Sequence, residues 1–199
     1  AQALSKQGKR ILLFDGDLGL ANLDIQLGLI PKTDLSAVIG GRLTLSQAII
    51  EYKGGNFDII AGQSGAGGLM NLPANRLQIL SNELSLISDQ YDSVLLDLGA
   101  GVERTVRQLA HNAKTCIVVL TDEPTSLTDA YAFIKVLHKE RPDIKVKIVT
   151  NIVNSIREGE RTYATVLKAC EGFLKFSPSL LGVIRRDSKV PDSIRSQEP

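Results

Sequence analysis

Apolar runs of strand length alternate with amphipathic stretches along most of the 199-residue chain. Three of these runs are almost continuously apolar, which is typical of strands buried on both faces of a parallel sheet. The pattern predicts six strands: Arg10–Asp15, Phe57–Gly62, Ser93–Leu98, Thr115–Thr121, Lys145–Asn151 and Leu180–Ile184.

Helical patterns lie between most of the expected strands. In Asn75–Gln90 leucine and isoleucine recur at spacings of three and four, so one apolar stripe faces a sheet. Ser126–Glu140 has a similar stripe, with Ser126 or Thr128 as its expected N-cap, and Gly159–Lys175 is a third helix. Strands that alternate with helices predict right-handed βαβ crossovers. The expected fold class is therefore α/β, a doubly wound, mostly parallel sheet with helices on both faces.

The two ends of the sequence suggest a piece of a longer protein. The first residues, "AQALSKQGKR", are typical of the last turns of a helix over Ala1–Gln7, which Gly8 closes directly before a strand. The last residues, "SIRSQEP", lie within or just after an amphipathic stretch. The sequence contains no repeat, low-complexity segment or linker, so we expect a single domain over residues 1–199.

Composition excludes several classes of protein. A hydrophobic content of 43% supports a packed core, and 23 basic against 22 acidic residues give a net charge of +1, too small to recruit nucleic acid or an anionic membrane by overall charge. Cys116 and Cys170 are not part of a Cys-x-x-Cys motif, and we expect reduced thiols rather than a zinc or redox site. No apolar stretch approaches about 18 residues and no signal peptide opens the chain, so we expect a cytoplasmic protein.

The candidate chemistry lies where two expected strands end. In a parallel sheet of this kind, ligands bind beyond the carboxyl ends of the strands. "DGD" at Asp15–Asp17 and "DLGAG" at Asp97–Gly101 place three carboxylates on two strands, with glycines that let backbone amides approach a ligand. Hydrated Mg²⁺ with phosphate oxygens needs such a set. The alternative is that each aspartate only caps the next turn or helix, and Asp24 is expected to be a helix-start residue.

A standard phosphate-binding loop is not found in this sequence. The nearest string, "ALSKQGKR", has Ala3 where the motif G-x-x-x-x-G-K-[ST] has its first glycine and Arg10 where it has a hydroxyl, and it precedes a strand instead of following one. The glycine-rich stretch Gly62–Leu72 follows a strand but contains no lysine. We interpret it as a loop at the rim of the site, with a loop that contacts a partner or nucleotide as the alternative.

Four segments carry a resemblance to a known family: "LLFDGDLGLANLDIQLGL", "YDSVLLDLGAGVE", "LTDEPTSLTDAYAFIK" and "GVIRRDSKVPDSIRSQEP". In order and spacing they resemble the MinD/ParA family of deviant Walker A ATPases, over essentially the whole chain. The branch they resemble most is that of the flagellar-number regulators called FlhG or FleN. The resemblance implies a P-loop NTPase fold, ATP and Mg²⁺ as cofactors, and a homodimer that sandwiches two ATP molecules and separates on hydrolysis.

The resemblance also implies roles for single residues. Asp17 corresponds to the switch I aspartate that positions the attacking water, with Asp15 beside it near the magnesium shell. Asp97 corresponds to the Walker B aspartate that holds magnesium through water. The other implied contacts are Asn22 in the nucleotide-sensing part of switch I, Gly101 near the γ-phosphate, Glu103 at the dimer interface, Asn151 on the adenine, and Arg186 and Asp187 in the loop that lines the base.

The sequence departs from the family pattern in three respects. The family's "KGGxGKT" loop would lie one helix upstream of Ala1, and without it weak or no nucleotide binding is expected. Leu98 stands where many relatives have serine or threonine, which removes a hydroxyl from switch II. The C-terminal amphipathic helix through which relatives reach the membrane would follow Pro199.

The leading hypothesis is an ATPase switch that controls the number or placement of flagella. The resemblance implies a flagellar GTPase similar to FlhF, a flagellar transcription regulator and the inner membrane surface as partners. Division-site selection and chromosome or plasmid partition are the alternatives within the family, and the low net charge disfavours strong DNA binding. A non-enzymatic adaptor of the same fold is a second class. A phosphoacceptor receiver domain is disfavoured because Asp17 and Asp97 are separated by more chain than one crossover.

Overall fold

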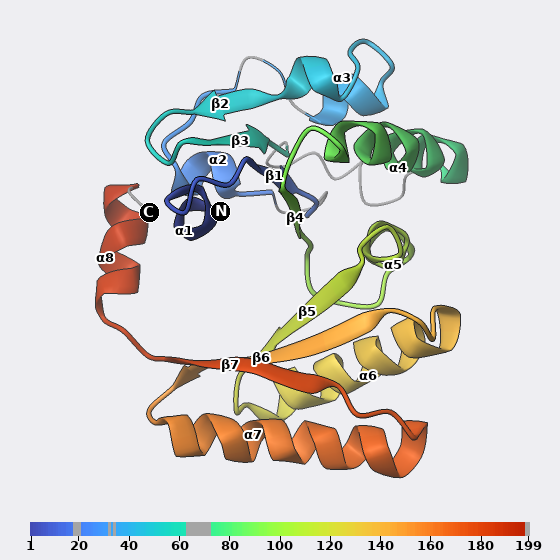
Figure 1. The fold of residues 1–199 in the computed structure, drawn as a ribbon, viewed down its shortest axis with the longest axis vertical. Helices are drawn as coiled ribbons and strands as arrows, with labels where there is room; N and C mark the ends of the chain where they lie inside the picture. The colour runs from blue at the N-terminus through green and yellow to red at the C-terminus, as the bar shows by residue number, and fades with distance from the viewer. Residues whose placement is uncertain (18–20, 32, 34, 63–72, 198–199) are drawn as a thin grey trace. The chain divides into compact units, whose positions relative to one another are not determined.

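The computed structural model describes residues 1–17, 21–31, 33, 35–62 and 73–197. These residues form two compact units, Ala1–Asn112 with Lys189–Pro199 and Ala113–Ser188. Each unit contains its own sheet with helices against it (Figure 1). The expected single domain over residues 1–199 stays a prediction.

The sheet of the first unit has the order β2-β3-β1-β4. Strands β1 (Ile11–Asp15), β3 (Phe57–Ile60) and β4 (Ser93–Asp97) are parallel, with β1 between the other two. Strand β2 (Ile50–Tyr52) pairs with β3 in the antiparallel direction. Among the described residues, no strand pairs with the second edge of β4. The first unit is therefore a mostly parallel sheet with one antiparallel edge strand.

The core of the first unit forms because the apolar side chains of β1 and β3 meet one stripe of a long helix. Leu12, Phe14 and Ile60 are buried against Leu77 and Leu80 of helix α4 (Ala74–Ser88), as the spacing of leucines in the sequence predicts. The remaining helices of this unit are α1 (Gln2–Ser5), α2 (Leu23–Gln26), α3 (Leu35–Ile39), η1 (Ser46–Ala48), α5 (Arg104–Ala110) and α8 (Lys189–Ser196).

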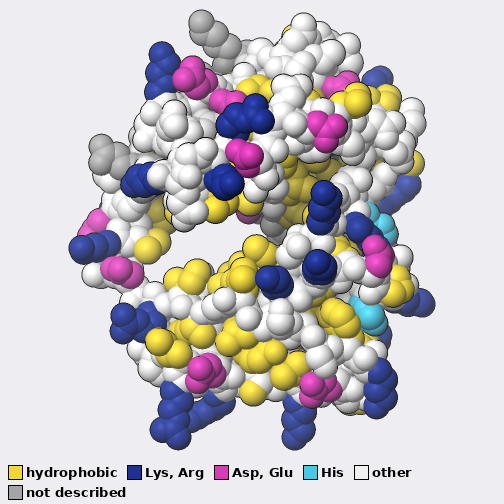
Figure 2. Space-filling view, in the orientation of Figure 1, with side chains coloured by type: hydrophobic (Ala, Val, Ile, Leu, Met, Phe, Trp, Pro, Cys, Tyr) yellow, Lys and Arg dark blue, Asp and Glu magenta, His cyan; other side chains and the backbone are white. Residues whose placement is uncertain are grey.

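The second unit is a fully parallel sheet with the order β5-β6-β7. Its strands are β5 (Thr115–Leu120), β6 (Lys145–Val153) and β7 (Ser179–Arg185). Helices α6 (Pro124–Glu140) and α7 (Ile156–Ala169) pack against these strands and against each other, and α7 continues into the π-helix η3 (Cys170–Leu174). Hydrophobic side chains also reach the surface over this unit (Figure 2), among them Val119, Leu181 and Ile184, each about half exposed.

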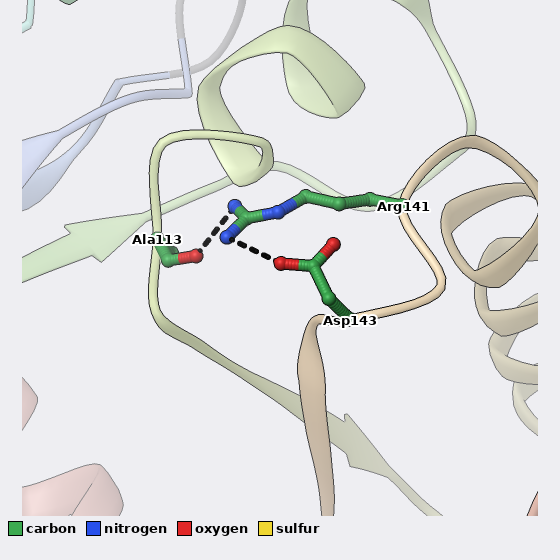
Figure 3. A network of polar contacts seen from close by, with 3 residues as sticks. All are labelled: Ala113, Arg141 and Asp143. Atoms are coloured by element: carbon green, nitrogen blue, oxygen red, sulfur yellow. Dashed lines mark hydrogen bonds and ion pairs between the residues drawn. The ribbon is translucent and has the colours of Figure 1, made fainter.

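Polar contacts fix the loops that enter β5 and β6. The Arg141 guanidinium donates a hydrogen bond of 2.8 Å to the Ala113 carbonyl and forms an ion pair of 3.5 Å with Asp143 (Figure 3). One side chain after α6 therefore holds the backbone before β5 and the turn before β6 together. Such a contact aligns the starts of two neighbouring parallel strands.

The structure corrects two local expectations. Helix α6 begins at Pro124 with Glu123 as N-cap residue, so Ser126 and Thr128 are not N-caps. The Ser126 hydroxyl instead accepts a hydrogen bond from the Thr121 backbone N–H at the end of β5. Proline at the first helical position has its φ preset, which explains the earlier start. Within the described residues, no helix is long and apolar enough to cross a membrane.

Candidate active site

Two of the predicted aspartates lie at the same level on neighbouring strands. Asp15 ends β1 and Asp97 ends β4, and the parallel register pairs these two residues directly. The backbone N–H of Gly16 donates a hydrogen bond of 2.7 Å to the Asp97 carbonyl, which extends the pairing one residue beyond β1. The carboxyl ends of two adjacent strands therefore bring two acidic residues together, as the sequence predicts.

The Asp15 carboxylate is buried and occupied by backbone donors. Its residue is 2% exposed, and its Oδ1 and Oδ2 accept hydrogen bonds of 3.3 Å from the backbone N–H groups of Asp17 and Leu23 respectively. Burial raises the pKa of Asp15 above its usual range, the Asp97 charge adds to the rise, and the backbone donors oppose it. Asp15 is thus enclosed by the loop that follows it.

The Asp17 carboxylate lies directly over the glycine that follows β4. A Cβ added at Gly99 would be 3.0 Å from the Asp17 Cγ, so any larger residue there would push this carboxylate away. Burial, and after it the charge of Asp17, raises the pKa of Asp97. A bound cation would relieve the repulsion between two carboxylate charges that influence each other in this way.

Two glycines, Gly16 and Gly62, allow neighbouring loops to approach closely around Asp15 and Asp97. A Cβ at Gly16 would be 2.7 Å from the Leu98 Cδ2, so the leucine side chain fills the space beside the end of β1. A Cβ at Gly62, just beyond β3, would be 2.3 Å from the Cβ of Ala21 and 3.3 Å from the Asp15 Cγ. Sequence reasoning missed both contacts. The available signal was a glycine at the end of an apolar strand, which indicates that another part of the chain approaches closely there. The spacing of residues does not identify which part of the chain that is.

The other predicted residues of the first unit lie on the loops after β1 and β4. Asn22 is the N-cap residue of α2, and its exposed side chain accepts a hydrogen bond of 2.8 Å from Gln26 Nε2. Gly101 has a φ of 112°, a conformation that favours glycine, with open space around it. Glu103 is the exposed N-cap residue of α5. Asp24 lies in the first turn of α2, which confirms its interpretation as a helix-start residue.

The predicted base-binding residues lie together in the second unit. Asn151 is near the end of β6, and Arg186 and Asp187 directly follow β7, the neighbouring strand. The Arg186 backbone N–H donates a hydrogen bond of 2.8 Å to the Val153 carbonyl, which holds the start of this loop against β6. All three residues therefore lie at the edge of this sheet where its parallel strands end.

The backbone beside Asn151 has an unusual conformation. Ile152 has a φ of 58°, and its N–H donates a hydrogen bond of 2.9 Å to the Asn151 side-chain oxygen. The register between β6 and β7 shifts at this point. A β-branched residue rarely adopts a positive φ, and such strain is concentrated at functional sites.

The donor set fits a magnesium ion that takes most of its ligands from elsewhere. Among the described residues, no group of three or more His, Cys, Asp or Glu side chains is close enough to hold a metal alone. The adjacent carboxylates of Asp17 and Asp97 supply hard oxygen ligands, which Mg²⁺ prefers together with water and phosphate oxygens. The glycine-rich stretch Gly62–Leu72 lies, apart from Gly62, outside the described residues.

Comparisons with known proteins agree with this arrangement. The family model of the CobQ/CobB/MinD/ParA nucleotide binding domain matches residues 1–199, so the chain belongs to this family, whose MinD/ParA members are P-loop ATPases. The antiactivator FleN of Pseudomonas aeruginosa is 36% identical over 197 residues, with 99% of this chain and 70% of FleN covered. The flagellum site-determining protein YlxH of Helicobacter pylori is 28% identical over 100% of this chain and 67% of YlxH. These relatives support the FlhG/FleN branch that the sequence resembles.

Solved structures confirm the fold class. The septum site-determining protein MinD of Pyrococcus horikoshii, solved in complex with Mg-ADP, matches with a TM-score of 0.81 and 24% identity over 100% of this chain and 77% of that chain. MinD in the MinC:MinD complex of Aquifex aeolicus matches with a TM-score of 0.75 and 24% identity over 99% of this chain and 77% of that chain. The chain therefore has the α/β fold of MinD/ParA P-loop NTPases.

Proposed function

We propose that this chain is the catalytic part of an ATP-dependent switch that regulates the number or placement of flagella. The observation that carries the proposal is the placement of the Asp17 carboxylate over Gly99 and beside Asp97, at the carboxyl ends of two adjacent parallel strands. The similarity to the flagellum site-determining protein YlxH, and to the antiactivator FleN of the branch that the sequence resembles, supports the flagellar assignment within the family.

Asp17 and Asp97 have separate roles in this proposal. Asp17 would orient the attacking water, and Asp97 is the residue that would hold Mg²⁺. The metal, when bound, neutralises the charge that develops on the phosphate oxygens. Phosphoryl transfer needs positioning and charge neutralisation more than covalent chemistry, so two carboxylates and a cationic phosphate-binding loop are sufficient.

The remaining predicted residues bind the nucleotide or the second subunit. Gly101 is proposed to lie near the γ-phosphate, and the open space beside its backbone leaves room for a ligand there. Asn151 hydrogen-bonds the adenine, and the strained backbone at Ile152 supports a functional role for this segment. The other proposed contacts are Arg186 and Asp187 on the base, Asn22 as nucleotide sensor and Glu103 at the dimer interface.

Because residues 1–199 contain no standard phosphate-binding loop, the phosphate-binding lysine is proposed to come from outside them. The edge of β4 that pairs with no strand among the described residues offers backbone groups for one more parallel strand. The open edge of β4 thus supports the expectation made from the motif pattern.

The test compares ATP turnover of the protein, expressed with the residues that its gene encodes before Ala1, and of an Asp17→Asn variant. We expect ATP binding to change by less than about threefold and kcat to fall by about 100-fold or more, since a general-base or water-positioning group contributes roughly that much. Asp24→Asn is the control, because the Asp24 carboxylate accepts a hydrogen bond from the Ile25 backbone N–H and has no proposed part in catalysis. Equal kcat for wild type and Asp17→Asn would reject the proposed role.

The proposed cellular partners follow from the same assignment. ATP is proposed to close a homodimer, and the dimer to bind a FlhF-like GTPase, a flagellar transcription regulator and the inner face of the cell membrane from the cytoplasm. Size-exclusion chromatography with light scattering, with ATP and with ADP, measures the first step. An Asp17→Asn variant that stays dimeric in ATP longer than wild type is the expected result, because hydrolysis separates the subunits.

Division-site selection is the second candidate function. The septum site-determining protein MinD of Bacillus subtilis is 29% identical over 99% of this chain and 72% of that protein. Deletion of the gene separates the two candidates. Altered flagellar number with normal division supports the flagellar role, and minicells with normal flagellation support division-site selection.

A further inference from the structure

Asp15 is the most enclosed charged side chain of the candidate site. Its residue is 2% exposed, whereas Asp17 and Asp97 are both more accessible to solvent. The two carboxylate oxygens of Asp15 accept hydrogen bonds from different backbone groups, Oδ1 from Asp17 and Oδ2 from Leu23. A carboxylate whose oxygens already serve the chain's own donors is poorly placed to bind an ion directly.

The contacts of Asp15 join positions that are far apart along the following loop. Two of its donors, Asp17 and Leu23, are two and eight residues further on, and Leu23 is the first residue of α2. A third residue of this segment, Ala21, is 3% exposed and closely approaches Gly62 beyond β3. The described ends of the loop are thus both fastened to one carboxylate inside the unit.

We infer that Asp15 is a positioning residue, whose carboxylate accepts hydrogen bonds from the backbone N–H groups of Asp17 and Leu23 and so holds the Asp17 carboxylate over Gly99. The residue type supports this role. Burial of a charge beside Asp97 is costly, yet only a carboxylate offers acceptors on both oxygens, whereas an asparagine would direct an NH₂ group at one of the two N–H donors. The kinetic part of the inference rests on the proposed ATPase function, and the structural part does not.

The structural part is tested by amide hydrogen exchange, followed by NMR, in the protein without nucleotide or metal. In Asp15→Asn we expect exchange at Asp17 or Leu23 to rise by about tenfold, the effect of one lost hydrogen bond. Asp24→Asn is the matched control, because its carboxylate caps a neighbouring N–H of the same helix, at Ile25. Unchanged exchange at both amides in Asp15→Asn would overturn the inference whether or not the protein hydrolyses ATP.

The kinetic part compares the same variants in Mg²⁺-dependent ATP hydrolysis. If Asp15 acts through Asp17, Asp15→Asn lowers kcat by about 10- to 100-fold, because a small misplacement of a reacting group has an effect of that size. The KM for ATP and the half-saturating Mg²⁺ concentration stay within about twofold. A tenfold or larger rise in the Mg²⁺ requirement would instead make Asp15 part of the metal site and overturn the positioning role.

The outcomes separate this inference from the proposed function. Wild-type protein that binds and hydrolyses no ATP rejects the proposed function, and the exchange experiment still decides whether Asp15 fastens the loop. Asp15→Ala adds a second measure, because it removes both acceptors and should increase exchange at both amides. If Asp15→Ala does not fold, the exchange measurement on Asp15→Asn, which keeps the size of the side chain, still tests the inference.

Discussion

Ile152 has a backbone conformation that is unfavourable for its β-branched side chain. Its φ of 58° costs a β-branched residue about 1 kcal/mol or more relative to asparagine or glycine. Because the side chain is 44% exposed, its replacement loses little apolar burial. We expect Ile152→Asn to raise the free energy of unfolding by about 1 kcal/mol in urea titrations.

Ile152→Val is the control for this prediction, because valine keeps the β-branch and hence the strain. A loss of stability in Ile152→Asn would show that the positive φ is not strained in solution. Nucleotide affinity that falls while stability rises would support the proposed role of Asn151, since the two residues share a hydrogen bond.

Cys116 is predicted to react slowly with thiol reagents. Burial raises the pKa of its thiol to about 11. Because the thiolate is the reactive form, modification by iodoacetamide at pH 8 should be about 100-fold slower than that of glutathione and should rise about tenfold per pH unit up to that pKa. Peptide mass spectrometry measures the modified fraction at Cys116. A rate within a few-fold of that of glutathione would contradict the raised pKa.

The three aspartates show how far a residue's role follows from sequence. The position of "DGD" and "DLGAG" after two apolar runs located them at the ends of two parallel strands, and the structure shows that these strands are neighbours. It could not show that Asp15 is buried or that its oxygens accept N–H groups from Asp17 and Leu23, because that depends on how the loop folds back. The catalytic and metal roles assigned to these residues stay predictions.

At the scale of elements, α7 packs closely against its sheet at one glycine, Gly159. A Cβ at Gly159 would be 2.4 Å from the Val183 Cγ1 and 2.7 Å from the Thr150 Oγ1. Gly159→Ala should therefore lower the free energy of unfolding by about 1 to 3 kcal/mol, as overpacked positions do. The measurement is the midpoint of chemical denaturation.

Gly172, in the π-helix that follows α7, provides the matched control. A Cβ there would have no atom within 4 Å. Gly172→Ala should leave stability unchanged or raise it by up to about 1 kcal/mol, because alanine has the higher helix propensity. If both variants behave alike, close packing at Gly159 is not the cause.

The elements themselves were predictable where one periodicity dominates. Each of the six expected strands is present with bounds within two residues, because long apolar runs leave no alternative. Strand β2 was missed, since its three residues carry too little pattern. Helix α7 begins at Ile156, three residues earlier than expected. Ser155, whose hydroxyl accepts from the Glu158 N–H, was a signal for that start.

At the scale of the whole molecule, the α/β class was predictable because it depends only on the order of strands and helices. The expected residues divide between the two compact units, with Asp17 and Asp97 in the first and Asn151 and Arg186 in the second. Each unit contains parallel strands whose carboxyl ends carry the predicted residues. Local sequence patterns alone did not assign these two units to one class of protein. The family match over residues 1–199 does, because it covers both units with one nucleotide binding domain.

The charge of the whole chain bears on the choice between flagellar and partition roles. With 23 basic and 22 acidic residues, the chain has a net charge of +1, so few phosphates of a DNA duplex would be neutralised by it. We expect no binding of a 30-base-pair DNA duplex tighter than about 10 μM at physiological salt, measured by fluorescence anisotropy with and without ATP. The same titration at low salt is the control, because it reveals weak electrostatic binding. Submicromolar binding in ATP with a steep salt dependence would favour a chromosome or plasmid partition ATPase over a flagellar regulator.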